Sequence, residues 1–164
     1  MGERIIMDRF IDLLLHISHG ELKDCGDYFQ IDHIDQSVSL LWKNQSSNTK
    51  IDGCDGDLED VYLAYDGCDL FSSGFKIASQ AIIKKIGDVE IIPTLLELKD
   101  IQIAEKVVFP SDTIPFMLEM GNWLYGYSKQ RKTYYKWDIE YHELGQEYHS
   151  LEEIFLDWKE AINE

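Results

Sequence analysis

Basic residues, cysteines and long apolar runs are all scarce in this chain. Lys and Arg number 15 against 31 Asp and Glu, so the formal net charge is −16. Phosphate groups carry the same sign of charge, and this balance therefore argues against binding to nucleic acid. A strongly acidic surface instead attracts basic proteins or cationic ligands and speeds their association.

The three cysteines, Cys25, Cys54 and Cys68, form no CxxC pair and have no regular spacing. They therefore indicate neither a disulfide framework nor a zinc site, and a reducing compartment fits them best. Near the N-terminus the longest apolar run is residues 13–15, which is too short for a signal sequence or a membrane span. We expect a cytoplasmic protein that does not associate with membranes.

Two helices are predicted in the first half of the chain. Apolar residues recur at three- and four-residue spacing over residues 5–17, and Gly20 is placed to end that helix. A second, shorter helix is predicted over residues 58–65, with acidic residues at its start and Gly67 as its stop. The segment 28–42 between them fits either a strand or an irregular connection, and residues 45–57 have the composition of an exposed loop.

The second half alternates predicted strands and helices. Short runs rich in β-branched and aromatic residues predict strands at 74–77, 89–92 and 106–109. One or two helical turns are expected over 79–87, and a helix over 94–106. Ser150 and Glu153 form a capping box before a final helix with one apolar side, made of Leu151, Ile154, Phe155, Trp158 and Ile162.

A β-hairpin is the clearest local signal. Its arms are 122–127 and 133–140, joined by the polar pentapeptide 128–132. On the first arm, one face holds Trp123, Tyr125 and Tyr127. Alternation on the second arm predicts that Tyr135, Trp137 and Ile139 point inward and that Tyr134, Lys136, Asp138 and Glu140 point outward. We therefore expect one α+β domain over residues 1–164, with a mostly antiparallel sheet, an N-terminal helix and a C-terminal helix that closes the core.

Few residues are spaced for chemistry. Asp55, Asp57 and Glu59 could begin a calcium loop, but Asp60 stands where an EF-hand needs glycine, so a solvated loop before a helix is the simpler interpretation. The pairs His16/His19 and His142/His149 match no metal or catalytic motif, and we expect the second pair in the loop before the last helix. The sequence also lacks a GxSxG elbow, a Walker loop and a GxGxxG motif. We expect no catalytic residue, no metal site and no cofactor.

The candidate partner surface is a group of acidic residues near the second helix. These are Asp55, Asp57, Glu59 and Asp60 at its start and Asp66 and Asp69 beyond its end. Six carboxylates within fifteen residues predict a focused negative potential for a basic protein, although solvation of a loop and a helix start would also account for them. The alternative surface is the outward side of the hairpin, with Tyr134, Asp138 and Glu140.

The order of features over residues 57–164 resembles the SUKH superfamily. The stretches that carry the resemblance are AYDGCDLFSSGFKI, VVFPSDTIPFML, NWLYGY with YYKWDIE, and YHSLEEIFLDW. That superfamily includes the fungal Smi/Knr regulators of cell-wall synthesis and many bacterial immunity proteins. The resemblance implies a non-enzymatic binding module that neutralises a toxin, often a nuclease, and the charge independently favours a basic partner. A scaffold or regulator of the Smi/Knr type is the alternative, and an enzyme or metal protein is the lesser one.

Overall fold

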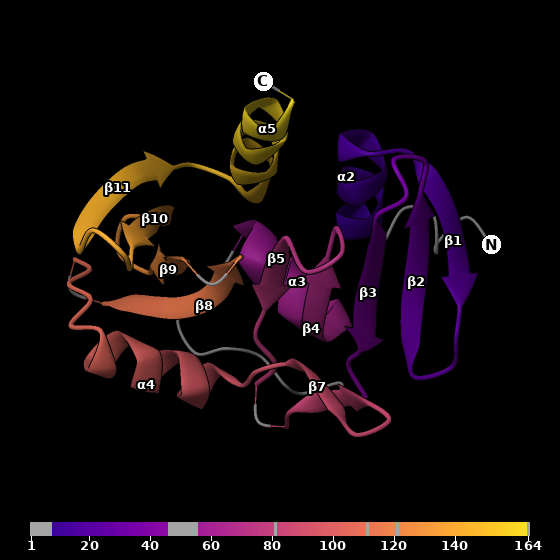
Figure 1. The fold of residues 1–164 in the computed structure, drawn as a ribbon, viewed down its shortest axis with the longest axis horizontal. Helices are drawn as coiled ribbons and strands as arrows, with labels where there is room; N and C mark the ends of the chain where they lie inside the picture. The colour runs from indigo at the N-terminus through magenta and orange to yellow at the C-terminus, as the bar shows by residue number, and fades with distance from the viewer. Residues whose placement is uncertain (1–7, 46–55, 81, 111, 121, 164) are drawn as a thin grey trace.

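The computed structural model describes residues 8–45, 56–80, 82–110, 112–120 and 122–163, which form four helices and eleven strands (Figure 1). The elements in chain order are α2 (Arg9–Ile17), β1 (Gly20–Asp24), β2 (Tyr28–His33), β3 (Val38–Lys43), α3 (Gly56–Ala64), β4 (Tyr65–Leu70), β5 (Phe75–Ile77), β6 (Lys84–Ile86), β7 (Val89–Ile92), α4 (Leu95–Ala104), β8 (Thr113–Glu119), β9 (Trp123–Ser128), β10 (Thr133–Asp138), β11 (Glu143–Tyr148) and α5 (Leu151–Ile162). The predicted α+β class is confirmed. No helix in these ranges is long and apolar enough to cross a bilayer.

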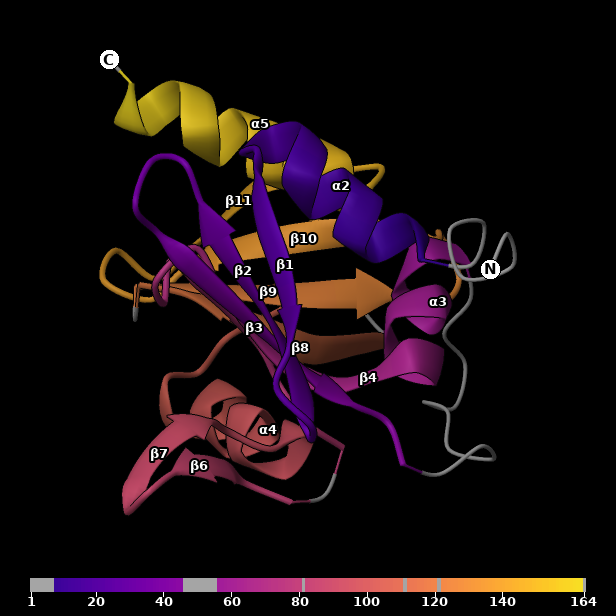
Figure 2. The same cartoon turned by 90° about the vertical axis from the view of Figure 1, so that its right-hand side faces the viewer.

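Nine strands make one sheet in the order β1-β2-β3-β4-β5-β8-β9-β10-β11, and every neighbouring pair is antiparallel. The spatial order of the strands therefore follows the chain. The segment between β5 and β8 leaves the sheet to form the separate β6–β7 hairpin and α4 (Figure 2).

Helices cover both faces of the sheet. Figure 1 shows α2 and α5 on one side and α4 on the other. The larger core lies under α2, α3 and α5 and includes Leu14, Tyr62 and Phe155. The smaller core joins α4 to the other face through Leu98, Leu124 and Trp137, among others. A strand in the middle of this sheet is therefore buried on both faces, which conceals the alternation that marks a half-buried strand.

The predicted first helix is confirmed from Arg9 onward, and residues 5–7 of that prediction lie outside the described ranges. Asp8 caps it, because its side chain accepts the Ile11 N–H at 2.9 Å. Gly20 begins β1, where a Cβ atom would lie 2.5 Å from the Asp32 carbonyl oxygen. Its small size thus allows close strand approach. Segment 28–42 forms β2 and β3, so its interpretation as a strand is right and the irregular alternative is wrong.

The second predicted helix is correct in position, since α3 spans Gly56–Ala64. Gly67 is not its stop: the chain enters β4 at Tyr65, and Gly67 lies inside that strand with a left-handed φ of 103°. A Cβ atom there would also lie 3.0 Å from the Ile92 side chain. This glycine is explained by strand packing and backbone conformation, not by a helix end.

Three other segment predictions are wrong. Residues 106–109 form no strand; the strand is β8, Thr113–Glu119, which tolerates Pro115 at a register shift. The predicted turn or two of helix over 79–87 contains β6 instead, paired with β7. The expected loop holding His142 and His149 contains β11, the last strand of the sheet.

The predicted hairpin is confirmed as β9 and β10, and Tyr135 and Trp137 are buried as expected, but Tyr134 and Asp138 do not point outward. Ser128 pairs with Thr133, so Tyr134 lies opposite Tyr127 and on the same face. Both belong to the larger core, and Tyr134 is only 1% exposed. Trp137 lies on the other face, in the smaller core. The expectation that Tyr134 points outward is therefore wrong, because this sheet has two covered faces.

The predicted last helix is confirmed as α5, and its Ser150 side chain accepts the Glu153 N–H at 3.1 Å. The return half of the capping box is different, since Glu153 accepts from the His149 N–H at 2.8 Å. Trp158 is half-buried and stacks on Phe71, with ring centroids 5.1 Å apart. Ile162 is exposed, so the apolar side ends one turn earlier than expected.

Candidate functional site

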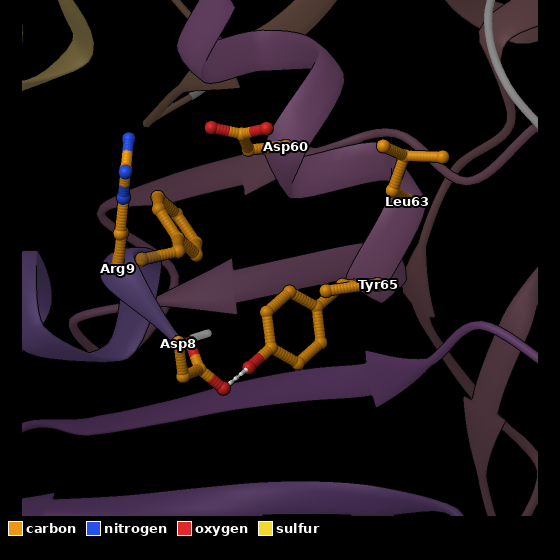
Figure 3. A pocket seen from close by; sticks show the side chains of 7 residues that line it. Asp8, Arg9, Asp60, Leu63 and Tyr65 are labelled. Carbon is orange, nitrogen blue, oxygen red and sulfur yellow. Dashed lines mark hydrogen bonds between the residues drawn. The ribbon is translucent and has the colours of Figure 1, made fainter. Parts of the chain in front are cut away.

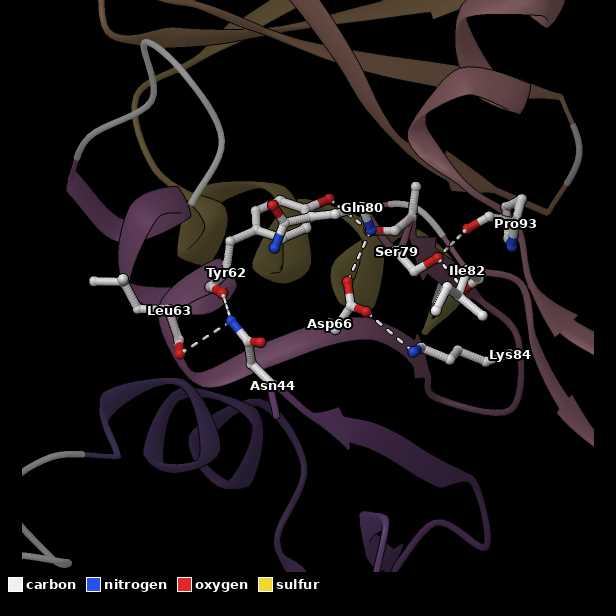
Figure 4. A network of polar contacts seen from close by, with 10 residues as sticks. Asn44, Tyr62, Leu63, Asp66, Ser79, Gln80, Ile82, Lys84 and Pro93 are labelled. Carbon is white, nitrogen blue, oxygen red and sulfur yellow. Dashed lines mark hydrogen bonds and ion pairs between the residues drawn. The ribbon is translucent and has the colours of Figure 1, made fainter. Parts of the chain in front are cut away.

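The six carboxylates expected to form one acidic surface do not share an exposed face. Asp66 forms an ion pair with Lys84 at 3.0 Å and accepts the Gln80 N–H at 2.8 Å (Figure 4). Asp69 is only 7% exposed and accepts the Ser73 hydroxyl at 3.1 Å. Burial raises the pKa of the Asp69 carboxyl.

Asp57 is also committed to an internal role. Its carboxylate accepts the Leu151 N–H at 3.0 Å and the Tyr134 hydroxyl. It therefore links α3 to the start of α5 and to β10. Glu59 is half-buried, and Asp55 lies outside the described residues. The prediction of one exposed field is wrong on geometry, whereas a partner contact by any of these residues stays a prediction.

Asp60 is exposed, and it lines a pocket of about 490 Å³ between α2 and α3 (Figure 3). Asp8, Phe10 and Tyr65 contribute to the lining. The Asp8 carboxylate is already occupied by the Tyr65 hydroxyl and the Ile11 N–H, so it serves as a structural acceptor. Asp60 is the one member of the six that the structure both describes and leaves exposed.

The second candidate surface is likewise divided. Tyr134 is buried, and Asp138 is a buried acceptor for the Tyr141 N–H at 3.0 Å. Glu140 is exposed in the turn that leads from β10 to β11. Of these three residues, Glu140 alone presents its side chain to solvent.

Several acids serve the core as hydrogen-bond acceptors. Besides the two pairs named above, Tyr125 donates to Glu119 and Tyr148 donates to Asp157, each at 2.6 Å. Burial is the main reason that the pKa values of Tyr65, Tyr125 and Tyr148 are raised, and the neighbouring carboxylates raise them further. Part of the acidic excess is therefore structural.

The exposed excess gathers on the C-terminal strand and helix. From residue 138 to residue 163 the sequence has eight acids and one base, Lys159, a net charge of −7. The exposed acids of this segment are Glu140, Glu143, Glu147, Glu152, Glu153, Asp157 and Glu160. Glu147 lies opposite Tyr135 and therefore on the α4 side of the sheet, so we call the other six acids the β11–α5 face. The Tyr148 hydroxyl at the end of β11 donates to Asp157 in α5, and this hydrogen bond ties the strand to the helix.

The single base of this segment does not neutralise the face. Lys159 donates to the backbone carbonyl of Ile17 in α2 and so fastens the last helix to the first. The Glu147 carboxylate accepts the Thr133 hydroxyl at 2.6 Å, which is the main cause of its lowered pKa. Glu147 is thus held in its charged form to lower pH than an ordinary glutamate.

The β11–α5 face also includes an edge of the sheet. β11 pairs with β10 on one side and is the last strand on the other. The register shifts where Gly145 and Gln146 lie opposite Lys136, which is a bulge. Backbone donors and acceptors of an edge strand are available to a partner. The face therefore offers a partner both negative charge and main-chain hydrogen-bonding groups.

Within the described ranges, no three His, Cys, Asp or Glu side chains gather in a way that could hold a metal ion. Cys25 is exposed and Cys68 is buried, where desolvation raises the pKa of its thiol; Cys54 falls on an undescribed position. His142 and His149 are exposed at the two ends of β11. His33 is buried between Ser18 and Ser39 and serves the fold.

Sequence reasoning missed the β11–α5 face because residues 142–149 were interpreted as a loop before the last helix. The available signal was the run of acids from Glu140 to Glu160 with one base among them. Comparison of the chain with protein-family models, with curated proteins and with solved structures finds no match.

Proposed function

We propose that this chain is a non-enzymatic binding module that neutralises a basic protein, in the manner of SUKH immunity proteins that block nuclease toxins in the cytoplasm. The observation that carries the proposal is the β11–α5 face, with six exposed acids on the last strand, the turn before it and the last helix. Such a field raises the rate of encounter with a basic partner and orients it before contact.

The structural role of the other acids supports this choice of surface. Asp57, Asp66 and Asp69 are held by internal partners, so a binding protein could not displace them without breaking contacts within the fold. Glu143 and Glu160, in contrast, are exposed on the strand and the helix of the face. Exposed carboxylates contribute to long-range attraction with little cost to folding.

The test is association with the product of the adjacent reading frame. Glu143→Lys together with Glu160→Lys changes the net charge by +4 on the β11–α5 face. Glu21→Lys together with Asp27→Lys changes it equally at the β1–β2 end of the sheet, where both acids are exposed. The first pair should slow association and flatten its dependence on salt, whereas the second should have the smaller effect, because local potential and not net charge steers the encounter.

Equal effects from the two double variants would mean that net charge alone matters and would remove this face from the proposal. A partner that is bound but not inhibited would favour a scaffold or regulator of the Smi/Knr type, since such a protein needs the same kind of surface without toxin neutralisation.

A further inference from the structure

Helix α4 carries a stripe of exposed side chains on the side away from the sheet. Leu96 and Ile103 are 68% and 69% exposed, whereas Leu98 is buried in the smaller core. Residues seven apart lie on the same side of an α-helix, so these two apolar residues belong to one stripe. Lys99 and Asp100 are exposed between them. The stripe thus runs apolar, positive, negative, apolar.

The surroundings of this stripe carry little net charge, whereas the chain as a whole is strongly acidic. Residues 82–110 contain four lysines and five acids, a net charge of −1, which leaves −15 for the remainder of the −16. The neighbouring β6–β7 hairpin adds Ile86 and Val89 to the exposed apolar residues, and Figure 2 shows it beside α4. Two chains with a net charge of −16 repel each other, and two copies of this near-neutral segment that face each other add little to that repulsion.

The stripe is also complementary to a second copy of itself that runs in the opposite direction. In an antiparallel pair of α4 helices with a two-fold axis between residues 99 and 100, Leu96 lies opposite Ile103 of the other copy. Lys99 of each copy then lies opposite Asp100 of the other copy, so the same contact between opposite charges occurs twice. Self-complementarity of this kind is what a two-fold symmetric interface requires.

We propose that the α4 stripe joins two copies of the chain into an antiparallel homodimer. A groove of about 310 Å³ between α4 and β8 opens beside the stripe, lined in part by Leu96, Lys99 and Pro115. Ile103 of the second copy, opposite Leu96, enters this groove. The dimer leaves the β11–α5 faces of both copies free, because α4 and α5 cover opposite faces of the sheet.

A protein of another kind fits the stripe less well. A basic partner is drawn to the acidic surfaces, and an acidic one is repelled by the net charge of −16. Added salt screens repulsion between two acidic copies, so it should strengthen the dimer. Salt should weaken capture of a basic partner at the β11–α5 face, and the two associations are therefore separable by salt alone.

The test is sedimentation equilibrium of the full chain at several concentrations and at low and moderate salt. Lys99→Asp or Asp100→Lys alone places two pairs of like charges across the two-fold axis and should weaken dimerisation by about tenfold or more. The double variant Lys99→Asp/Asp100→Lys exchanges the charges and should restore the dimer. Ile34→Asp, at an apolar residue that is also highly exposed but lies between β2 and β3, should change nothing.

A monomeric wild-type chain at all concentrations and salts would overturn the proposal. So would a dimer that both single variants leave intact, or a double variant that stays as weak as the singles. Circular dichroism and thermal unfolding of each variant separate loss of the dimer from loss of the fold. Failure here leaves the binding of a basic partner untouched, because that binding depends on other residues.

Discussion

The hydroxyl of Ser39 lies 2.8 Å from Nε2 of His33, and the same oxygen accepts the backbone N–H of Phe71 at 3.0 Å. His33 in turn lies 2.7 Å from the Ser18 carbonyl through Nδ1, which must therefore donate. One buried chain of hydrogen bonds thus connects the end of α2 with β2, β3 and the β4–β5 turn. In that turn Phe71, Ser72 and Ser73 all have left-handed φ angles.

Ser39→Ala should destabilise the protein by about 1–3 kcal/mol. The substitution removes the hydroxyl that is the hydrogen-bond partner of both His33 Nε2 and the Phe71 N–H, and both groups stay buried. Urea unfolding measures the change. Ser37→Ala is the matched control: Ser37 also bonds through its hydroxyl, to Asp35 at 2.6 Å, but in an exposed turn. If Ser37→Ala lowered the free energy of unfolding as much as Ser39→Ala does, burial of these hydrogen bonds would not explain the effect.

Asp57→Ala should cost about 2–3 kcal/mol, since a carboxylate that accepts both a backbone N–H and a tyrosine hydroxyl is removed from the junction of α3, β10 and α5. Asp60→Ala, three residues later on the same helix but exposed, should cost less than about 0.5 kcal/mol. The two free energies of unfolding distinguish a structural acid from a surface one. Equal values would restore Asp57 to the surface group predicted from the sequence.

Trp158→Ala should lower the free energy of unfolding by about 2–3 kcal/mol. Truncation of a fully buried aromatic residue typically costs about 3–5 kcal/mol, but this indole is only half-buried against Phe71 and Phe75. Trp137 packs in the smaller core on the other face. The double variant Trp137→Ala/Trp158→Ala should therefore equal the sum of the single variants within about 0.5 kcal/mol. Strong non-additivity would mean that the two tryptophans share one core, as the sequence alone suggested.

Stability should fall steeply above about pH 10, where tyrosines of the unfolded chain begin to lose their protons. The raised pKa values of Tyr65 and Tyr125 keep the folded protein protonated there, so the unfolded state binds fewer protons and unfolding becomes more favourable. Each tyrosine contributes a loss of about 1.4 kcal/mol per pH unit, while below about pH 10 its contribution is complete.

Urea midpoints at about pH 8, 9, 10 and 11 measure this loss. Tyr65→Phe removes one titrating hydroxyl and should reduce the slope above about pH 10, although it lowers stability at neutral pH by removing the bond to Asp8. A stability that does not change between about pH 9 and 11 would contradict the assignment.

Elements with their own local signals were predictable. The apolar spacing of α2 and the Ser150 cap of α5 placed both helices, and the tyrosine-rich arms placed the β9–β10 hairpin. What depends on distant parts of the chain was not predictable. Tyr134 and Tyr135 are both buried because helices cover both faces of the sheet, and no local pattern says which face a residue takes.

The candidate site shows the same division. Acid density in the sequence correctly indicated a strongly negative protein, but it could not say which carboxylates are internal acceptors. Asp57 and Asp60 are three residues apart on one helix and differ only in what lies opposite them, namely Tyr134 and Leu151 for the first and solvent for the second. Those neighbours are 77 and 94 residues away in sequence from Asp57.

The near-sequential order of the strands has a consequence for how fast the protein folds. Most neighbouring strands in the sheet are joined by a short turn, so most pairings close small loops and cost little chain entropy. The contact of β5 with β8 is different, because the β6–β7 hairpin and α4 must first be looped out between them. We expect this pairing to be the slowest to form. Shortening the connection between Ile77 and Thr113 should then accelerate folding more than shortening any hairpin turn, provided that the smaller core is repacked.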